Sequence, residues 1–387
     1  MYFSSRVGSA SLNAVTAAQL EARREGRRLT NLSDSNPTRA GLAPSVVPEI
    51  YSAQPQGSLA DRELIADFIA RTESRTVTPD QLYVLSSTSE AYAWIFKLLC
   101  DPGDIVLAPS PGYPLVEQIA RLESVQTRYY SLGLPGEWEI DTGQIRELLE
   151  SSEGERIRAI VAINPNNPTG SYVSADEHER LAQLAAEYSV ALIADEVFFD
   201  YPLDDRPRQR LAGETGALTF ALDGLSKHLA APGAKVAWIE VSGPSVDVRE
   251  AQWRLDMIAD AYLPMSTLIS RELPKLLAAV PEHQEVVRTR CAQNLAALQH
   301  LVDKDPHGLA TVYAPQGGWS ALLRFPASIS EDELVTTLIA EQGITVQPGY
   351  FFDMSIPGFV SVSLLLEPEE FRRATEQLLA TVARLAV

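Results

Sequence analysis

A lysine closes the segment Gly224-Leu225-Ser226-Lys227, which follows the hydrophobic run 218–222 and precedes a stretch rich in small residues, 228–235. A side chain placed between a buried strand and closely packed backbone loses hydration, and this lowers the pKa of its amine. Such an amine can form a Schiff base with an aldehyde cofactor. The four residues alone are equally compatible with a loop lysine that precedes a helix.

An acid and an amide follow two other apolar runs. Asp195 comes directly after the run 190–194. An acid at the end of an apolar strand needs a partner, either a protonated ring nitrogen or a structural salt bridge. Asn167 lies in the Asn-Pro loop 164–170, where prolines turn the chain and hold it rigid. Its amide can donate to a ligand oxygen, although a plain Asn-Pro turn has the same sequence.

Hydroxyl residues and an aromatic ring complete this set. Ser86-Ser87-Thr88-Ser89 stand between the run 82–85 and a helical pattern. At a helix N-terminus they present free backbone N–H groups and the positive end of the helix dipole, which is a phosphate site, or they simply cap the helix. Tyr113, in the Pro-rich segment 109–114, is either a ring that stacks on a cofactor or a loop aromatic that covers the core.

These groups follow strand-length apolar runs that alternate with helical patterns. The strand candidates are 82–85, 105–108, 157–163, 190–194, 218–222 and 236–241, and the helical patterns include 90–99, 115–122 and 175–188. They predict an α/β fold with a mostly parallel central sheet covered by helices on both faces. Because ligands bind beyond the carboxyl ends of such strands, the five groups are expected at one edge of the sheet. Together they are the parts that hold pyridoxal phosphate.

The pattern changes after about residue 281. Helical patterns at 285–301, 331–342 and 369–386 alternate there with strand candidates at 320–325, 344–346 and 360–366. We therefore expect a large cofactor domain over 46–281, a smaller α+β domain over 282–387, and an N-terminal arm over 1–45 that joins the smaller domain. In the large domain, Ser174 and Glu177 form a capping box that predicts a helix from residue 175.

Composition excludes several classes of protein. The chain has 387 residues, 45% of them hydrophobic, so it is long enough for two folded lobes. A formal net charge of -19 repels phosphate backbones and argues against a nucleic-acid partner. Cys100 and Cys291 form no disulfide framework, which fits a reducing compartment. Without a long apolar run or a secretory N-terminus, a cytoplasmic protein with no membrane segment is expected, and no metal site is expected.

The order and spacing of the segments resemble the fold-type I, class I/II aminotransferases, from about Leu29 to the C-terminus. The resemblance rests on the lysine segment 224–237, on the Asn-Pro-Asn-Asn-Pro-Thr-Gly loop 164–170, and on Asp195, which lies 28 residues after Asn167 and 32 before Lys227. It implies pyridoxal 5'-phosphate as the cofactor.

The resemblance also implies roles for the residues. Lys227 would hold the cofactor as an aldimine and move the proton at the substrate α-carbon. Asp195 would keep the ring nitrogen protonated, Asn167 would bond the phenolic oxygen, and Tyr113 would stack on the ring. The groups implied to hold the phosphate are Ser87, Thr88, Ser89, Ser226 and, from a neighbouring subunit, Tyr51, with Ser266 and Thr267 near it. The implied active unit is therefore a homodimer.

Three positions depart from the family pattern. Lys235 stands where the family usually has an arginine that binds the phosphate, so the charge is kept but the bidentate geometry is lost. Phe198 stands where a tyrosine often bonds the phenolic oxygen. Ser361, in Phe-Val-Ser-Val-Ser, occupies the position of the arginine that clamps the substrate carboxylate. Other residues suggested for the substrate site are Asn36 and Arg39 in the N-terminal loop, Arg324, and Trp319, for which core packing is the alternative.

We therefore predict an aminotransferase that moves an amino group from an amino acid or related amine to a keto acid. Because Ser361 replaces the clamp and fold does not decide reaction, a lyase, cyclase or decarboxylase acting on a specialised amino acid is the alternative. A ligand-sensing regulator domain of the same fold is a third interpretation, which the net charge of -19 disfavours.

Overall fold

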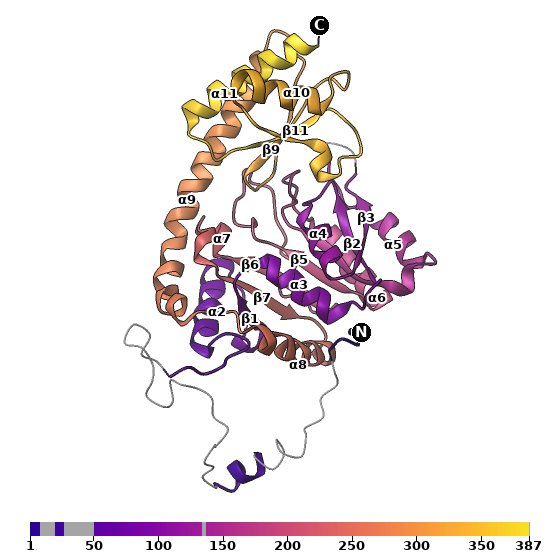
Figure 1. The fold of residues 1–387 in the computed structure, drawn as a ribbon, viewed down its shortest axis with the longest axis vertical. Helices are drawn as coiled ribbons and strands as arrows, with labels where there is room; N and C mark the ends of the chain where they lie inside the picture. Colours follow the sequence, from indigo (N-terminus) through magenta and orange to yellow (C-terminus); the bar gives the residue numbers. More distant parts are fainter. Residues whose placement is uncertain (8–19, 27–49, 134–136, 387) are drawn as a thin grey trace.

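The computed structural model describes residues 1–7, 20–26, 50–133 and 137–386. Its larger domain is built on a seven-stranded sheet with the order β1-β7-β6-β5-β4-β2-β3 (Figure 1). The strands are β1 (Leu82–Leu85), β2 (Ile105–Ser110), β3 (Gln126–Ser131), β4 (Ile157–Ile163), β5 (Ala191–Asp195), β6 (Thr219–Gly224) and β7 (Ala237–Ser242). The strands from β6 to β3 pair in parallel, whereas β7 is antiparallel to both of its neighbours. The mostly parallel sheet predicted from the sequence is confirmed.

Helices cover both faces of this sheet, as predicted. One face packs against α3 (Thr88–Leu99), α4 (Leu115–Leu122) and α8 (Ser245–Tyr262). The other face packs against α5 (Thr142–Glu150) and α6 (Ala175–Tyr188). Burial on both faces explains why β5 and β6 are apolar runs rather than alternating ones: every residue of both strands is buried.

The start of α6 shows how local sequence sets an element. Ser174 accepts a hydrogen bond from the backbone N–H of Glu177, and the Glu177 carboxylate accepts one from the backbone N–H of Ser174. This is the predicted capping box, which satisfies donors that the first helical turn leaves free. Leu181 and Leu184 then face the sheet.

The smaller domain carries a four-stranded antiparallel sheet with the order β10-β11-β9-β8. Its strands are β8 (Thr311–Tyr313), β9 (Ser320–Arg324), β10 (Gln347–Pro348) and β11 (Phe359–Ser363), and its helices are α10 (Glu331–Thr337) and α11 (Pro368–Leu385). The strand predicted over 344–346 is wrong, because pairing with β11 begins only at Gln347. The helix predicted over 331–342 changes at Leu338 into a wider π-helical turn that ends at Gln342.

A single helix joins the two domains. α9 (Thr267–Lys304) is 38 residues long and begins well before the predicted start at residue 285. Its first half packs against α2 (Leu59–Glu73), and its second half packs in the core of the smaller domain and against α11. Figure 1 shows α9 running along one side of the molecule from one domain to the other. No described helix is both long and apolar enough to cross a membrane.

Short helical turns complete the described elements: η1 (Pro79–Gln81), η2 (Gly154–Arg156), η3 (Pro232–Ala234) and η5 (Gly349–Phe352) are 3-10 turns, and α7 (Leu225–His228) is one turn of α-helix. The first seven residues lie against the large domain, where Ser4 N–H donates to the carbonyl of Leu98 and Arg254 donates to the carbonyl of Val7. The arm expected over 1–45, which would join the smaller domain, stays a prediction. Most of the rest of that arm lies outside the described residues.

Candidate active site

Lys227 is placed by a tight turn at the end of β6. The strand ends at Gly224, and α7 follows at once. A Cβ at Gly224 would lie 2.7 Å from the carbonyl oxygen of Val236, so only glycine allows β6 to pass so close to the chain that leads into β7. The hydroxyl of Tyr201 donates a hydrogen bond to the carbonyl of Lys227 at 2.5 Å. These contacts hold the lysine at the carboxyl end of the parallel strands.

The amine of Lys227 lies beside a pair of aromatic rings that contact each other edge to face, with centroids 5.2 Å apart. Its Nζ is 4.9 Å from the centre of the Phe198 ring and 5.2 Å from that of Trp319. Burial lowers the pKa of Lys227, and the negative charge of Asp195 opposes this shift only in part. The side chain is thus half-buried rather than fully solvated, and its role as the Schiff-base lysine stays a prediction. Only the neutral amine reacts with a carbonyl, so the lowered pKa increases the reactive fraction of the amine.

Asp195 ends β5 and is 7% exposed. Its Oδ2 accepts a hydrogen bond from the hydroxyl of Tyr92 at 3.0 Å, and its Oδ1 accepts one from the backbone N–H of Val197 at 3.4 Å. Burial raises the pKa of Asp195 to about 6, although both hydrogen bonds act against the rise. No cation forms a salt bridge with this carboxylate within the described residues. The interaction of Asp195 with a protonated ring nitrogen stays a prediction.

Behind Asp195 lies a buried group of charges centred on Arg210. The guanidinium is bonded or close to four carboxylates: Asp200 at 2.8 Å, Glu196 and Glu73 at 3.3 Å, and Asp223 at 3.9 Å. Burial raises the pKa of Glu196 to about 7 even with Arg210 beside it. Glu196 directly follows Asp195, and Asp223 lies four residues before Lys227. The ion pairs of this cluster therefore hold the chain next to both Asp195 and Lys227.

His228 extends the same cluster. Its Nε2 lies 2.8 Å from the Oδ2 of Asp223, and its Nδ1 lies 2.8 Å from the Nε2 of Gln284 on α9. The ring is stacked on Trp238 with centroids 5.8 Å apart. Burial lowers the pKa of His228, but the nearby carboxylates outweigh it and the net shift is upward. The residue after Lys227 is thus fixed by both a strand and the helix that joins the domains.

The Asn-Pro loop connects the two domains at the site. Gly170 has φ +72°, and a Cβ there would lie 2.2 Å from the Cβ of Pro315. Its carbonyl accepts hydrogen bonds from the backbone N–H groups of Gln316 and Gly317. Asn167, Phe198 and Trp319 line one small crevice at this contact. The side-chain amide of Asn167 has no hydrogen-bond partner among the described residues, so it is available to a ligand.

At the N-terminus of α3 the structure shows the helix cap, and the phosphate site stays a prediction. Ser87 caps the helix by accepting a hydrogen bond from the N–H of Glu90 at 3.2 Å, and Glu90 in turn accepts from Ser86. Thr88 and Ser89 are the first helical residues, so their N–H groups have no partner within the helix. An anion can therefore bind there while the cap is in place.

Other predicted cofactor residues are more exposed. Ser226 is half-buried in α7, and Lys235 is exposed after η3, with φ 52°. Tyr113 is 40% exposed, and its pKa is raised by burial and by the charge of Asp195. Tyr51 is 43% exposed and borders a crevice that Thr267 also lines, while Ser266 caps α9 through the N–H of Leu268.

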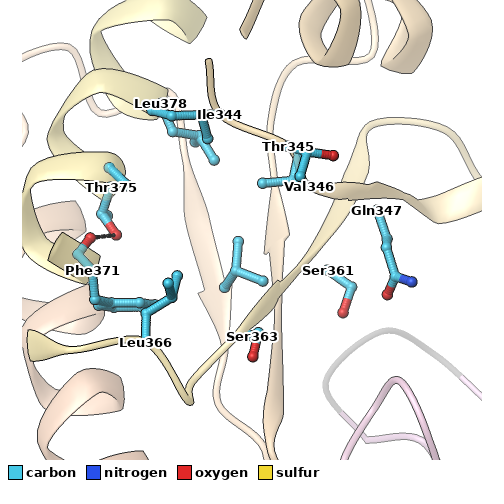
Figure 2. Close-up of a pocket in the computed structure, with 12 residues that line it drawn as sticks. Ile344, Thr345, Val346, Gln347, Ser361, Ser363, Leu366, Phe371, Thr375 and Leu378 are labelled. Carbon is cyan, nitrogen blue, oxygen red and sulfur yellow. Dashed lines mark hydrogen bonds between the residues drawn. The ribbon is translucent and has the colours of Figure 1, made fainter. Parts of the chain in front are cut away.

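Ser361 is buried in β11 and faces the large domain. It pairs with Leu322 of β9, and this side of the sheet also presents Phe359, which joins the large-domain core. Figure 2 shows the pocket beside it, with Gln347 and Ser361 on one flank and Phe371 on the other. All twelve lining residues are uncharged.

Of the other residues suggested for the substrate site, Arg324 and Trp319 lie within the described residues. Arg324 is exposed at the end of β9, where its guanidinium lies over the ring of Phe359. Asn36 and Arg39 lie outside the described residues. Trp319 contacts Lys227, Phe198 and Tyr201, so its ring belongs to the site as well as to the domain contact.

These residues fit pyridoxal 5'-phosphate on the chemistry of the donor set. The lysine amine is partly desolvated, the carboxylate of Asp195 is buried and keeps free acceptor positions, and the amide of Asn167 is unpaired. A free helix N-terminus begins at Thr88 on the helix that also carries the Asp195 partner, Tyr92.

Comparisons with known proteins give the family and the fold of the chain. The sequence pattern of the family "Aminotransferase class I and II" matches residues 51–378. The chain therefore belongs to the class I and II aminotransferase family. The alanine aminotransferase of Pyrococcus furiosus has the same fold, with a TM-score of 0.78 and 20% identity, over 98% of this chain and 99% of that one.

Curated relatives carry more than one activity in their names. The alanine aminotransferase of Mycobacterium bovis is 27% identical over 94% of this chain and 87% of its own length. The S-alkyl-thiohydroximate lyase of Arabidopsis thaliana is 28% identical over 64% of this chain. The chain spans about half the length of this lyase and of a probable aminotransferase from the same plant, 52% and 49% respectively.

Sequence reasoning missed Tyr92, Arg210 and His228. Tyr92 lies inside an apolar helical pattern, and only its buried hydroxyl at Asp195 gives it a role. A signal for it was available: a tyrosine buried in an otherwise apolar helix face requires a hydrogen-bond partner. Arg210 lies in a loop, and its carboxylate neighbours come from separate elements, with Glu73 far away in the sequence, so no spacing pattern indicates them.

Proposed function

We propose that this protein is a pyridoxal 5'-phosphate-dependent aminotransferase that moves an amino group from an amino acid or related amine to a keto acid. The observation that carries the proposal is the half-buried Lys227 amine, which lies over the paired rings of Phe198 and Trp319 with a lowered pKa, at the edge of the sheet where Asp195 is buried. Membership of the family and the likeness to an alanine aminotransferase support it.

Each residue has a definite task in this reaction. When bound, pyridoxal 5'-phosphate supplies an aldehyde that binds amines and a ring that takes up the electron pair of the substrate α-carbon. Lys227 acts as a nucleophile and then, once displaced by the substrate amine, as the base and acid that moves the α-proton. Asp195 places a negative charge beside the ring nitrogen. Phe198 and Trp319 keep water away from Nζ.

The test has a covalent and a chemical part. The holoenzyme is reduced with borohydride and digested, and the cofactor is expected on the peptide that contains Lys227. Lys227→Ala abolishes the label, whereas Lys275→Ala, at an exposed lysine of α9, does not. The wild type is then incubated with single amino acids, including alanine, and release of a keto acid is measured together with conversion of the cofactor to its amine form. Absence of that conversion with every donor would show that the reaction is not transamination.

A second candidate is supported by Ser361. Ser361 offers no positive charge at the position where the resemblance implies a clamping arginine, and its side chain is buried in β11. A lyase, cyclase or decarboxylase acting on a specialised amino acid is therefore the alternative, and one relative is named as a lyase. Loss of sulfide, ammonia or carbon dioxide from a donor, with the cofactor left in its aldehyde form, distinguishes these reactions from transamination.

We also propose a cytoplasmic homodimer in which Tyr51 reaches the neighbouring active site. Tyr51 is exposed at a crevice next to the start of α9, and the two cysteines are free and buried. Mixing two inactive variants tests this. A hybrid of Lys227→Ala and Tyr51→Ala subunits has one site with both wild-type residues only if Tyr51 acts across the interface. Recovery of activity on mixing is expected, and no recovery despite subunit exchange contradicts the proposal.

A further inference from the structure

We propose that Tyr92 is a positioning residue that keeps Asp195 ionised and oriented toward the cofactor ring. The inference rests on the proposed cofactor site and adds a residue to it. Tyr92 comes from α3, the helix whose N-terminus is the candidate phosphate site, and it reaches the end of β5 through the core. One helix would therefore serve both ends of the cofactor.

The geometry is that of a dedicated hydrogen bond. Both side chains are buried, at 2% exposure for Tyr92 and 7% for Asp195, and the Oη to Oδ2 distance is 3.0 Å. Burial and the charge of Asp195 raise the pKa of Tyr92 well above its ordinary value, so the phenol keeps its proton and acts as the donor. With Oδ2 held by Tyr92 and Oδ1 turned toward the N–H of Val197, the carboxylate cannot rotate freely.

The hydrogen bond matters because the surroundings oppose the charge. Burial favours the protonated form of Asp195, and Asp223 on β6 acts in the same direction. The positive charge of Lys227 on α7 lowers the pKa of Asp195. The charge of Asp195 in turn raises the pKa of Tyr113, which follows β2. A donor that bonds the ionised form lowers a carboxyl pKa. Tyr92 therefore maintains the carboxylate that a protonated ring nitrogen requires.

Packing alone does not explain the hydroxyl. The ring of Tyr92 packs against Phe96 with centroids 5.8 Å apart, and phenylalanine would keep that contact. Tyr130 offers a comparison within the same domain. It is also buried, but its hydroxyl donates at 2.8 Å to the backbone carbonyl of Val161. This acceptor is uncharged, so the hydrogen bond shifts no carboxyl pKa. Tyr130→Phe is therefore a matched control for the loss of a buried hydroxyl.

The experiment measures cofactor affinity rather than turnover. Apoprotein is dialysed against pyridoxal 5'-phosphate at a series of pH values, and bound cofactor is quantified for wild type, Tyr92→Phe, Tyr130→Phe and Asp195→Asn. Affinity should fall as the pH drops through the range in which Asp195 takes up a proton. In Tyr92→Phe the midpoint of this fall should move upward by about one pH unit, because a hydrogen bond to a charged group is worth on the order of one to two pK units. Tyr130→Phe should leave the midpoint in place.

The outcomes separate the inference from the proposed site. Equal midpoints for Tyr92→Phe and wild type, with folded protein shown by circular dichroism, overturn the role of Tyr92. An unchanged pH dependence in Asp195→Asn shows instead that Asp195 is not the cofactor partner, and the proposed site itself fails. If Tyr92→Phe folds poorly, the double variant Tyr92→Phe/Asp195→Asn decides: an additive loss of stability means that the two side chains are not coupled, and this also overturns the inference.

Discussion

Replacing Arg210 with methionine should destabilise the large domain strongly. Methionine keeps most of the volume but removes the only positive group bonded to Glu196 within the described residues. The side chain of Arg210 is 10% exposed, and those of Glu196 and Glu73 are 1% and 4% exposed. Removing one partner of a buried ion pair costs about 3–5 kcal/mol, since the remaining charge has neither water nor a counter-ion. We expect a loss in this range at pH 8.

The pH dependence of that loss has a definite sign. Burial holds the folded-state pKa of Glu196 near 7, above its value in the unfolded chain. A carboxyl with a raised pKa contributes stability below its unfolded pKa and loses it as the pH rises through about 7. Without Arg210 the folded pKa rises further, so the difference between variant and wild type is largest above pH 7. It shrinks toward pH 5.5, where Glu196 is neutral in both proteins.

Urea unfolding of the apoprotein, followed by tryptophan fluorescence at pH 8 and pH 5.5, measures both effects. Arg206→Met is the control, because Arg206 is 62% exposed and pairs only with Asp204 among the described residues; it should change stability by less than about 1 kcal/mol. A loss for Arg210→Met that equals the control, or that grows as the pH falls, refutes the reasoning about the buried cluster.

Three further predictions concern the loops and strands around the site. Gly170→Ala should cost about 2–5 kcal/mol in urea unfolding, because φ +72° is strained for alanine and its Cβ would overlap Pro315; unchanged stability contradicts the described contact. Ser87→Ala should cost about 1 kcal/mol through loss of the cap on Glu90, and a larger effect on phosphate affinity than on stability would point to direct binding. Ser361→Arg should raise the rate with α-amino acids relative to the matching amines by about tenfold, as one charge-assisted hydrogen bond contributes; an equal rise for amines counts against a clamp at this position.

The sequence indicated the candidate cofactor residues at the strand ends, but not the buried residues that contact them. Lys227, Asp195 and Asn167 each follow an apolar strand, and parallel strands bring their carboxyl ends together, so local pattern and topology give the same answer. Strand β3 was not predicted because Gln126–Ser131 is polar along most of its length and lies at the edge of the sheet. Helix α9 was predicted only over its second half, since Pro274 and Pro281 interrupt the pattern that the structure nevertheless continues.

The groups that tune the site escaped prediction for a different reason. Tyr92 meets Asp195 across 103 residues of sequence, and Arg210 meets Glu73, the last residue of α2. Such pairs are created by tertiary packing, and no periodicity records them. The resemblance to the family alone singled out Lys235, Tyr51 and Ser361. The structure gives their exposure and neighbours, and their roles stay predictions.

The long helix α9 suggests where this chain can be divided into two genes. Proline has no backbone N–H, so the helix already lacks one hydrogen bond at Pro281. On one side, Leu273 and Val280 are buried against the large domain; on the other, Cys291 and Leu298 are buried in the small one. A cut after Pro281 leaves each fragment with its own packed half-helix. The fragment with Lys227 and the fragment with Trp319 could then be expressed separately, and their reassociation would be reported by the return of the Trp319 ring to the side chains of Lys227 and Phe198.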